Sequence, residues 1–126
     1  MSRKIRIQVG DQIVHGKLSD NETADKIWEA LPIETSVSTW GQEFYFGIGL
    51  SLELAPDART EMELGELGFW PPGNAFCIFF GPTPASHGDE PRAASAVNPF
   101  GKIEQDVSGL KSIPSGTKIL IEAVAS

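Results

Sequence analysis

The chain has 126 residues, of which 40% are hydrophobic and 21% are charged, values that are typical of a globular protein and exclude a disordered one. Its formal net charge of −7 excludes nucleic acid and anionic membranes as expected partners, because phosphate groups would be repelled and no basic stripe offsets the repulsion. The single cysteine, Cys77, rules out an intrachain disulfide. With no secretory signal, and no apolar stretch near the about 20 residues that cross a bilayer, we expect one cytoplasmic domain over residues 1–126.

Alternating apolar and polar residues predict a β-hairpin at the start of the chain. Apolar residues occupy every second position over residues 4–9, and a Gly-Asp turn leads into a second strand over residues 12–18. The spacing of Ser19 and Glu22 is that of a capping box, in which hydroxyl and carboxylate each accept from a backbone amide at the start of a helix. An apolar stripe at helical spacing follows, so we expect a helix that ends at Pro32.

Short strands separated by turn residues are predicted for the middle of the chain. Gly41-Gln42 favours a hairpin turn, and Pro71-Pro72-Gly73-Asn74 must form a turn because proline cannot donate to a sheet ladder. The stretch 75–80 is apolar throughout, as expected of a strand covered on both faces. The other strands expected in this part of the chain are residues 36–40, 43–48, 50–54, 61–64 and 67–70.

Glycine, proline and serine are frequent over residues 81–92, which we expect to form the longest exposed loop. Short strands are predicted at residues 94–97 and 100–103, a short helix at 106–113 and a final strand at 118–124. Many short strands with two helices predict a mostly β, antiparallel barrel or sandwich whose open ends the helices cover.

Two stretches of the chain resemble a known family. They are T-W-G-Q-E-F-Y-F at residues 39–46 and F-W-P-P-G-N-A-F-C-I-F-F-G-P-T-P at 69–84, and the runs A-S-A-V-N at 94–98 and G-K-I at 101–103 complete the likeness. The family is that of small, stand-alone prokaryotic cyclophilin-like proteins of unassigned function. The resemblance implies a closed, eight-stranded cyclophilin-like antiparallel β-barrel with two short helices capping its ends. The Phe-His-Arg and Gln-Gly-Gly-Asp segments with which true cyclophilins grip the prolyl carbonyl are missing from this sequence.

Aromatic residues from three segments that carry this resemblance suggest a ligand groove. Trp70 directly precedes the Pro-Pro turn, at a strand end where rings often line a groove, although packing in the core is the ordinary interpretation of such a large ring and the one favoured for it. Polar residues that could surround the groove are Thr39, Glu43, Thr83, Ser86, Arg92, Ser95 and Asn98. The predicted ligand-binding residues are Trp40, Glu43, Tyr45, Trp70, Phe80, Thr83, Ser86 and Asn98.

Other catalytic or metal-binding patterns have an ordinary structural interpretation. His15 and His87 are far apart and no Cys or His pair has ligand spacing, so we predict no metal site and no cofactor. Ser86, His87 and Asp89 have the residue types of a catalytic triad, but a working triad usually draws its members from separate elements. We therefore expect an ordinary polar loop there, and a buried, inert thiol at Cys77.

Three functional classes follow from these observations. We favour a binding module that holds a small molecule or a proline-containing peptide in the aromatic groove. The alternative is a peptidyl-prolyl isomerase with a rearranged site, in which Arg92 is the candidate catalytic residue because it is the one arginine expected in a suitable loop. The third class is an assembly role through the Trp70 turn, and the oligomeric state is left open.

Overall fold

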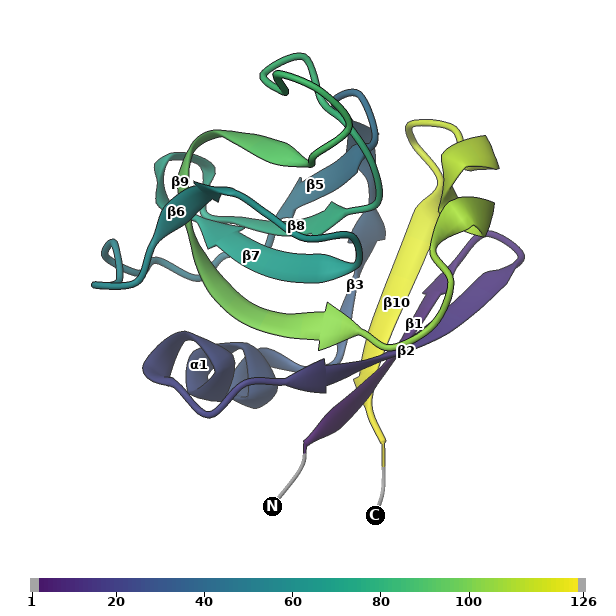
Figure 1. The fold of residues 1–126 in the computed structure, drawn as a ribbon. Helices are drawn as coiled ribbons and strands as arrows, with labels where there is room; N and C mark the ends of the chain where they lie inside the picture. The colour runs from purple at the N-terminus through teal and green to yellow at the C-terminus, as the bar shows by residue number, and fades with distance from the viewer. Residues whose placement is uncertain (1–2, 125–126) are drawn as a thin grey trace.

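The computed structural model describes residues 3–124 and is dominated by antiparallel β-strands (Figure 1). The elements in chain order are β1 (Lys4–Val9), β2 (Gln12–Leu18), α1 (Glu22–Ala30), β3 (Ile33–Ser36), β4 (Ser38–Thr39), β5 (Glu43–Gly47), β6 (Arg59–Glu61), β7 (Glu66–Trp70), the 3-10 helix η1 (Pro71–Gly73), β8 (Ala75–Phe79), β9 (Arg92–Ile103), the 3-10 helix η2 (Ser108–Ser112) and β10 (Lys118–Ala123). Within the described residues, none of the helices is long and apolar enough to span a membrane.

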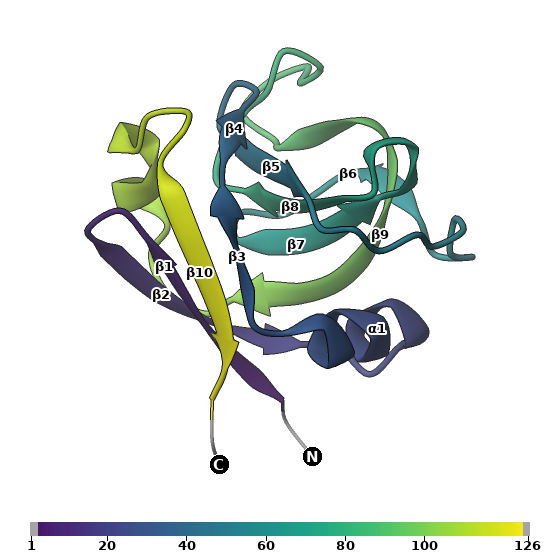
Figure 2. The ribbon, with the colours of Figure 1, turned by 180° about the vertical axis from the view of Figure 1, so that it is seen from behind.

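The strands form one strongly curled sheet. Its hydrogen-bonded order is β3-β10-β1-β2-β9-β7-β8-β5-β4, and β6 pairs with β9 off this path. The two ends of the path, β3 and β4, follow one another along the chain (Figure 2). Val37 between them bonds to the turn before β10, through its amide to Thr117 O at 2.9 Å and its carbonyl to Gly116 N at 2.7 Å. Because no ladder within residues 3–124 joins the two ends of the path, the sheet is not closed by hydrogen bonds and the closed barrel is not confirmed.

The predicted first helix is present as α1, but its cap differs from the prediction. The N-cap is Asn21, whose Oδ1 accepts from the amide of Ala24 at 2.8 Å, so the capping box of Ser19 and Glu22 is wrong. The Asn21 amide also donates to Pro99 O at 3.0 Å and so ties the helix to β9. Asn21 is the cap because its side chain bonds at the same time to the amide of Ala24 and to the carbonyl of Pro99. The helix lies across the lower end of the curled sheet (Figure 1).

The second predicted helix is only the short 3-10 helix η2. The Asp106 carboxylate accepts from the amide and the hydroxyl of Ser108, both at 2.9 Å, and these bonds start a tight turn rather than an α-helix. Leu110 and Ile113 are nevertheless buried in the main core. The described residues therefore contain one α-helix and two 3-10 helices.

Several strand predictions differ from the structure. The strand predicted at 36–40 is replaced by β3 and β4, which cover residues 33–36 and 38–39. The alternating leucines at 50–54 lie in an irregular segment, whose end is bonded to the Asn98 side chain: this side chain accepts from Ala55 N at 2.8 Å and donates to Glu53 O at 2.9 Å. β6 covers residues 59–61 instead of 61–64, and β9 is one long strand instead of two. β9 continues through Pro99 because its register with β7 shifts there, opposite Gly68.

Two apolar layers lie on the two faces of β8, which is buried along its whole length as predicted. Phe76 and Ile78 belong to the main core. The other face packs on a smaller core formed by Met62, Ala75, Cys77, Phe79, Ala93 and Val97. Cys77 is 1% exposed, which confirms the prediction of a buried thiol. The smaller core lies between β8 and the first half of β9, next to the cavity described below.

Candidate functional site

A cavity of about 230 Å³ lies beside the smaller core, between residues of β5, of β9 and of the end of β7. We call it the aromatic cavity. Its lining residues are Trp40, Glu43, Tyr45, Trp70, Ala93, Ala94 and Val97. Four of the predicted ligand-binding residues, Trp40, Glu43, Tyr45 and Trp70, are thus brought together around one space.

The β4–β5 hairpin positions one wall of the aromatic cavity. The turn at Gly41 has a φ of +60°, and the amide of Trp40 donates to the carbonyl of Glu43 at 3.0 Å. Along β5, Glu43 and Tyr45 share one face of the strand while Phe44 lies in the main core on the other. The sequence alternation of β5 therefore directs the carboxyl and the phenol to the same side.

The turn after β7 holds Trp70 in place. Its indole Nε1 donates to the hydroxyl of Ser95 at 2.7 Å, and its ring packs on the smaller core. A Cβ at Gly73 would lie 2.9 Å from the ring, so the close approach of η1 to the indole requires glycine there. Trp70 is half-buried, which means that it serves both as packing and as a wall of the cavity.

Glu43 is the electrostatically unusual residue of the site. Its side chain is 5% exposed, and its Oε1 has no hydrogen-bond partner among the described residues. Burial raises the pKa of Glu43 from 4.5 to about 7, an effect that the neighbouring Cys77 thiol partly offsets. Burial, together with Glu43, raises the pKa of Cys77 well above its usual value, so the thiol stays neutral. A buried carboxyl that titrates near neutral pH, in an apolar cavity, is typical of functional sites.

Two other predicted ligand residues lie away from the cavity. Phe80 belongs to the main core, where its ring centroid is 4.6 Å from that of Phe44. Asn98 is 1% exposed and holds the irregular segment through Glu53 and Ala55. Both residues contribute to packing or to chain positioning, and neither lines the cavity.

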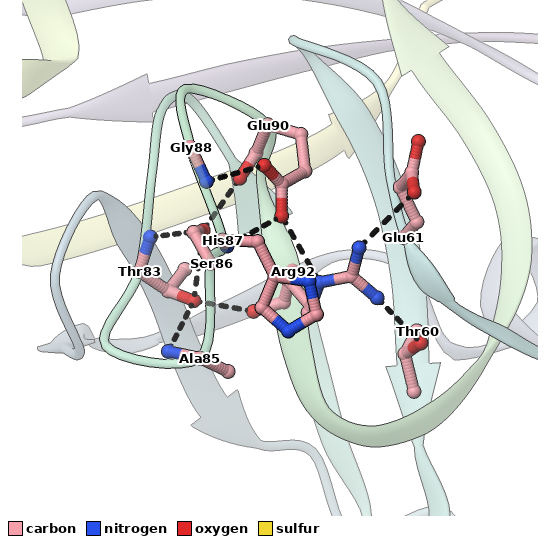
Figure 3. A network of polar contacts seen from close by, with 9 residues as sticks. All are labelled: Thr60, Glu61, Thr83, Ala85, Ser86, His87, Gly88, Glu90 and Arg92. Atoms are coloured by element: carbon pink, nitrogen blue, oxygen red, sulfur yellow. Dashed lines mark hydrogen bonds and ion pairs between the residues drawn. The ribbon is translucent and has the colours of Figure 1, made fainter.

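The segment predicted to be an exposed loop is irregular up to β9, and it contains a bonded cluster, which we call the loop cluster: Thr83, Ser86, Glu90 and Arg92 (Figure 3). The Ser86 hydroxyl accepts from Thr83 N at 2.9 Å and donates to Glu90 O. The Thr83 hydroxyl donates to Arg92 O. The Glu90 carboxylate accepts from the amides of His87 and Gly88, both at 2.8 Å. Thr83 and Ser86 therefore hold the loop together and do not line the cavity.

The guanidinium of Arg92 is engaged on three sides. It donates to Glu90 at 3.0 Å, to Glu61 at 3.1 Å and to the hydroxyl of Thr60 at 3.3 Å (Figure 3). These bonds attach the start of β9 to β6. His87 enters the loop cluster through its backbone amide.

Sequence reasoning missed the β9 wall of the cavity. Ala93, Ala94 and Val97 line it, and together with Trp70 and Tyr45 they leave the space open. The signal was the run of small residues A-A-S-A at 93–96, since small side chains opposite large rings leave a void. Within residues 3–124, no group of three or more His, Cys, Asp or Glu side chains is arranged to hold a metal ion.

Comparison with known proteins gives two similarities. The family model described as cyclophilin-like matches residues 3–122. The solution structure of the hypothetical protein AF2241 from Archaeoglobus fulgidus is similar to this chain, with 35% sequence identity and a TM-score of 0.81. That similarity covers 96% of this chain and 94% of the archaeal one. None of the curated proteins matches the chain.

Proposed function

The chain belongs to the cyclophilin-like family, and we propose that it is a binding module that holds a small molecule or a single peptide side chain in the aromatic cavity. The observation that carries the proposal is the carboxyl of Glu43, a residue that lines an apolar cavity and whose Oε1, shielded from solvent, has no hydrogen-bond partner among the described residues. An apolar pocket with few converging polar groups is the usual form of a ligand site. A bound donor would satisfy the carboxyl.

The size of the aromatic cavity favours a small ligand. Its volume of about 230 Å³ is below the roughly 300–1,000 Å³ of sites that enclose drug-sized molecules. An extended peptide could place one side chain in this volume.

The isomerase alternative lacks a comparable supporting observation. Its candidate residue, Arg92, already donates to Glu90, Glu61 and Thr60. A prolyl carbonyl would have to displace one of these acceptors. We therefore keep isomerase activity as an outcome of the test.

The test is an amide NMR titration with a small-molecule fragment set and with proline-containing peptides, including exchange spectroscopy on the peptide cis and trans signals. We expect ligand-induced shifts to concentrate at residues 40–45, at Trp70 and at residues 93–97, without enhanced cis–trans exchange. Trp70→Ala removes a wall and should abolish binding, and Ala94→Phe should do so by filling the cavity without removing any packing. Enhanced exchange, or binding that survives in both folded variants, would contradict the proposal.

A further inference from the structure

We propose that the aromatic cavity recognises a protonated amine, whose N–H group donates to Glu43 while its carbon substituents contact the three aromatic rings of the cavity. This inference rests on the proposed function and specifies the chemical class of the ligand. It follows from the carboxyl, from the rings and from the absence of competing cations in the described lining.

The carboxyl defines the polar requirement of the ligand. Oε1 of Glu43 is shielded from solvent and lacks a donor among residues 3–124, so a ligand that reaches as far as this carboxyl and offers an N–H group would satisfy it. The Cys77 thiol is the titratable group beside it, and that thiol is neutral. Burial opposes ionisation of Glu43, and a positively charged partner removes most of this penalty. A hydrogen bond between two charged groups is also stronger than one between neutral groups.

The rings supply a second attraction that is specific for cations. Trp40, Tyr45 and Trp70 present aromatic surface to the same space, and a cation near the face of a ring is attracted by its electron density, most strongly for tryptophan. No lysine or arginine belongs to the described lining, so the rings and the carboxylate have no cation of the protein within the cavity. A ligand cation would occupy that position.

Other ligand classes fit less well. An anion would meet the Glu43 carboxylate and a chain of net charge −7. A neutral alcohol could donate to the carboxylate, but it would leave the negative charge uncompensated and would gain no attraction from the rings. A metal ion would find only one carboxylate in the lining, too few ligands for a closed site.

The same chemistry could come from two sources, a free alkylamine or the side chain of a lysine in a peptide. The volume of about 230 Å³ admits a small alkylamine or one lysine side chain. The matched probes are hexylamine with 1-hexanol, and N-acetyl-lysine amide with N-acetyl-norleucine amide. Each pair differs chiefly in the charged ammonium group.

The experiment measures dissociation constants of these probes by tryptophan fluorescence and amide NMR at pH 8, where Glu43 is largely ionised. The variants are Glu43→Gln and Glu29→Gln, which change the net charge equally, and Glu29 is exposed on α1 far from the cavity lining. We expect each amine to bind at least about tenfold more tightly than its neutral partner in the wild type and in Glu29→Gln. Glu43→Gln should lose this preference, with the neutral probes unaffected.

The outcomes separate the inference from the proposed function. Equal binding of amine and neutral probe, or a preference that persists in Glu43→Gln, would overturn the inference and leave the binding module standing. If no probe binds, the inference is also overturned, and the fragment titration described above decides on the binding module independently. Tighter binding of the lysine amide than of hexylamine would support the inference with a peptide as the source, and the reverse would support it with a free amine.

Discussion

The loop cluster and the aromatic cavity contain carboxyl groups in opposite environments. In the loop cluster, Glu90 accepts from the amides of His87 and Gly88 and from Arg92, and these bonds lower its pKa from 4.5 to about 2. In the cavity, Glu43 has an Oε1 without a partner among the described residues, and burial raises its pKa to about 7. A polar group whose bonds are all made within the chain stabilises the fold. A buried polar group that lacks a hydrogen-bond partner within the chain destabilises the fold and is free to bind a ligand.

The largest expected effect of this difference is on the pH dependence of stability. Between pH 4.5 and about 7, folded Glu43 keeps a proton that the unfolded chain has released, so the free energy of unfolding falls as the pH rises through this window. The loss amounts to about 3 kcal/mol, at about 1.4 kcal/mol per pH unit. The glutamine of Glu43→Gln cannot ionise, so the free energy of unfolding of this variant should not fall in this way. Urea unfolding of both proteins from pH 4.5 to 8 measures it.

Glu29→Gln is the matched control for that measurement, because it removes an exposed carboxyl of the same type. Its curve should follow the wild type over the whole range. If the Glu43→Gln curve also ran parallel to the wild type, the carboxyl would not be destabilised by its cavity. The contrast between the two regions would then be wrong.

The next largest effect is expected in the loop cluster. Ser86→Ala removes one hydroxyl that accepts from Thr83 N and donates to Glu90 O, and both backbone groups lose their partner. We expect the free energy of unfolding to fall by about 2 kcal/mol. Ligand binding in the aromatic cavity should not change, because Ser86 does not line it. Urea unfolding with an NMR titration measures both, and Ser115→Ala, on an exposed turn, is the control.

The elements that the sequence predicts correctly are those that depend on local patterns of apolar residues. The β1–β2 hairpin and α1 follow from repeats of two and 3.6 residues, and the two-sided burial of β8 follows from its uninterrupted apolar run; the structure confirms all three. The resemblance is also confirmed by the family match. The leucines at 50–54 have the alternation of a strand, but the segment is irregular, and the backbone at Glu53 and Ala55 bonds to the side chain of the distant Asn98. Such a contact across the chain leaves no local pattern.

The candidate site was predictable to the same extent. Trp40, Glu43, Tyr45 and Trp70 meet because a hairpin and a Pro-Pro turn, both visible in the sequence, place them on one face. Thr83, Ser86 and Arg92 have similarly suggestive residue types, yet they bond within the loop cluster. Sequence shows that a group is polar, but only the folded geometry shows whether its bonds are already made.

A smaller effect is expected for Arg92, the residue considered for isomerase chemistry. Arg92→Gln breaks ion pairs to Glu61 and Glu90, and pairs near the surface are worth about 1 kcal/mol or less. We expect the free energy of unfolding, measured with urea, to fall by that amount. The fall should be similar for Arg6→Gln, which breaks an ion pair to Glu122. Ligand binding and peptide cis–trans exchange should not change. A specific loss of either property would show that the loop cluster is functional and would break the contrast with the cavity.

The smallest expected effect is the acid-side counterpart of the Glu43 prediction. Glu90 has a folded pKa of about 2, below its ordinary 4.5, so its contribution to stability is fully present above pH 4.5 and is lost as the pH falls through about 2. Because the side chain is in contact with solvent, the effect is small, and carboxyl carbon NMR shifts measure it more directly than unfolding does. We expect midpoints near 2 for Glu90 and near 7 for Glu43 in one titration. Two midpoints near 4.5 would mean that neither environment perturbs the pKa of its carboxyl group. Widely separated midpoints would show that the chain binds the Glu90 carboxylate with its own amides and leaves the Glu43 carboxyl for a ligand.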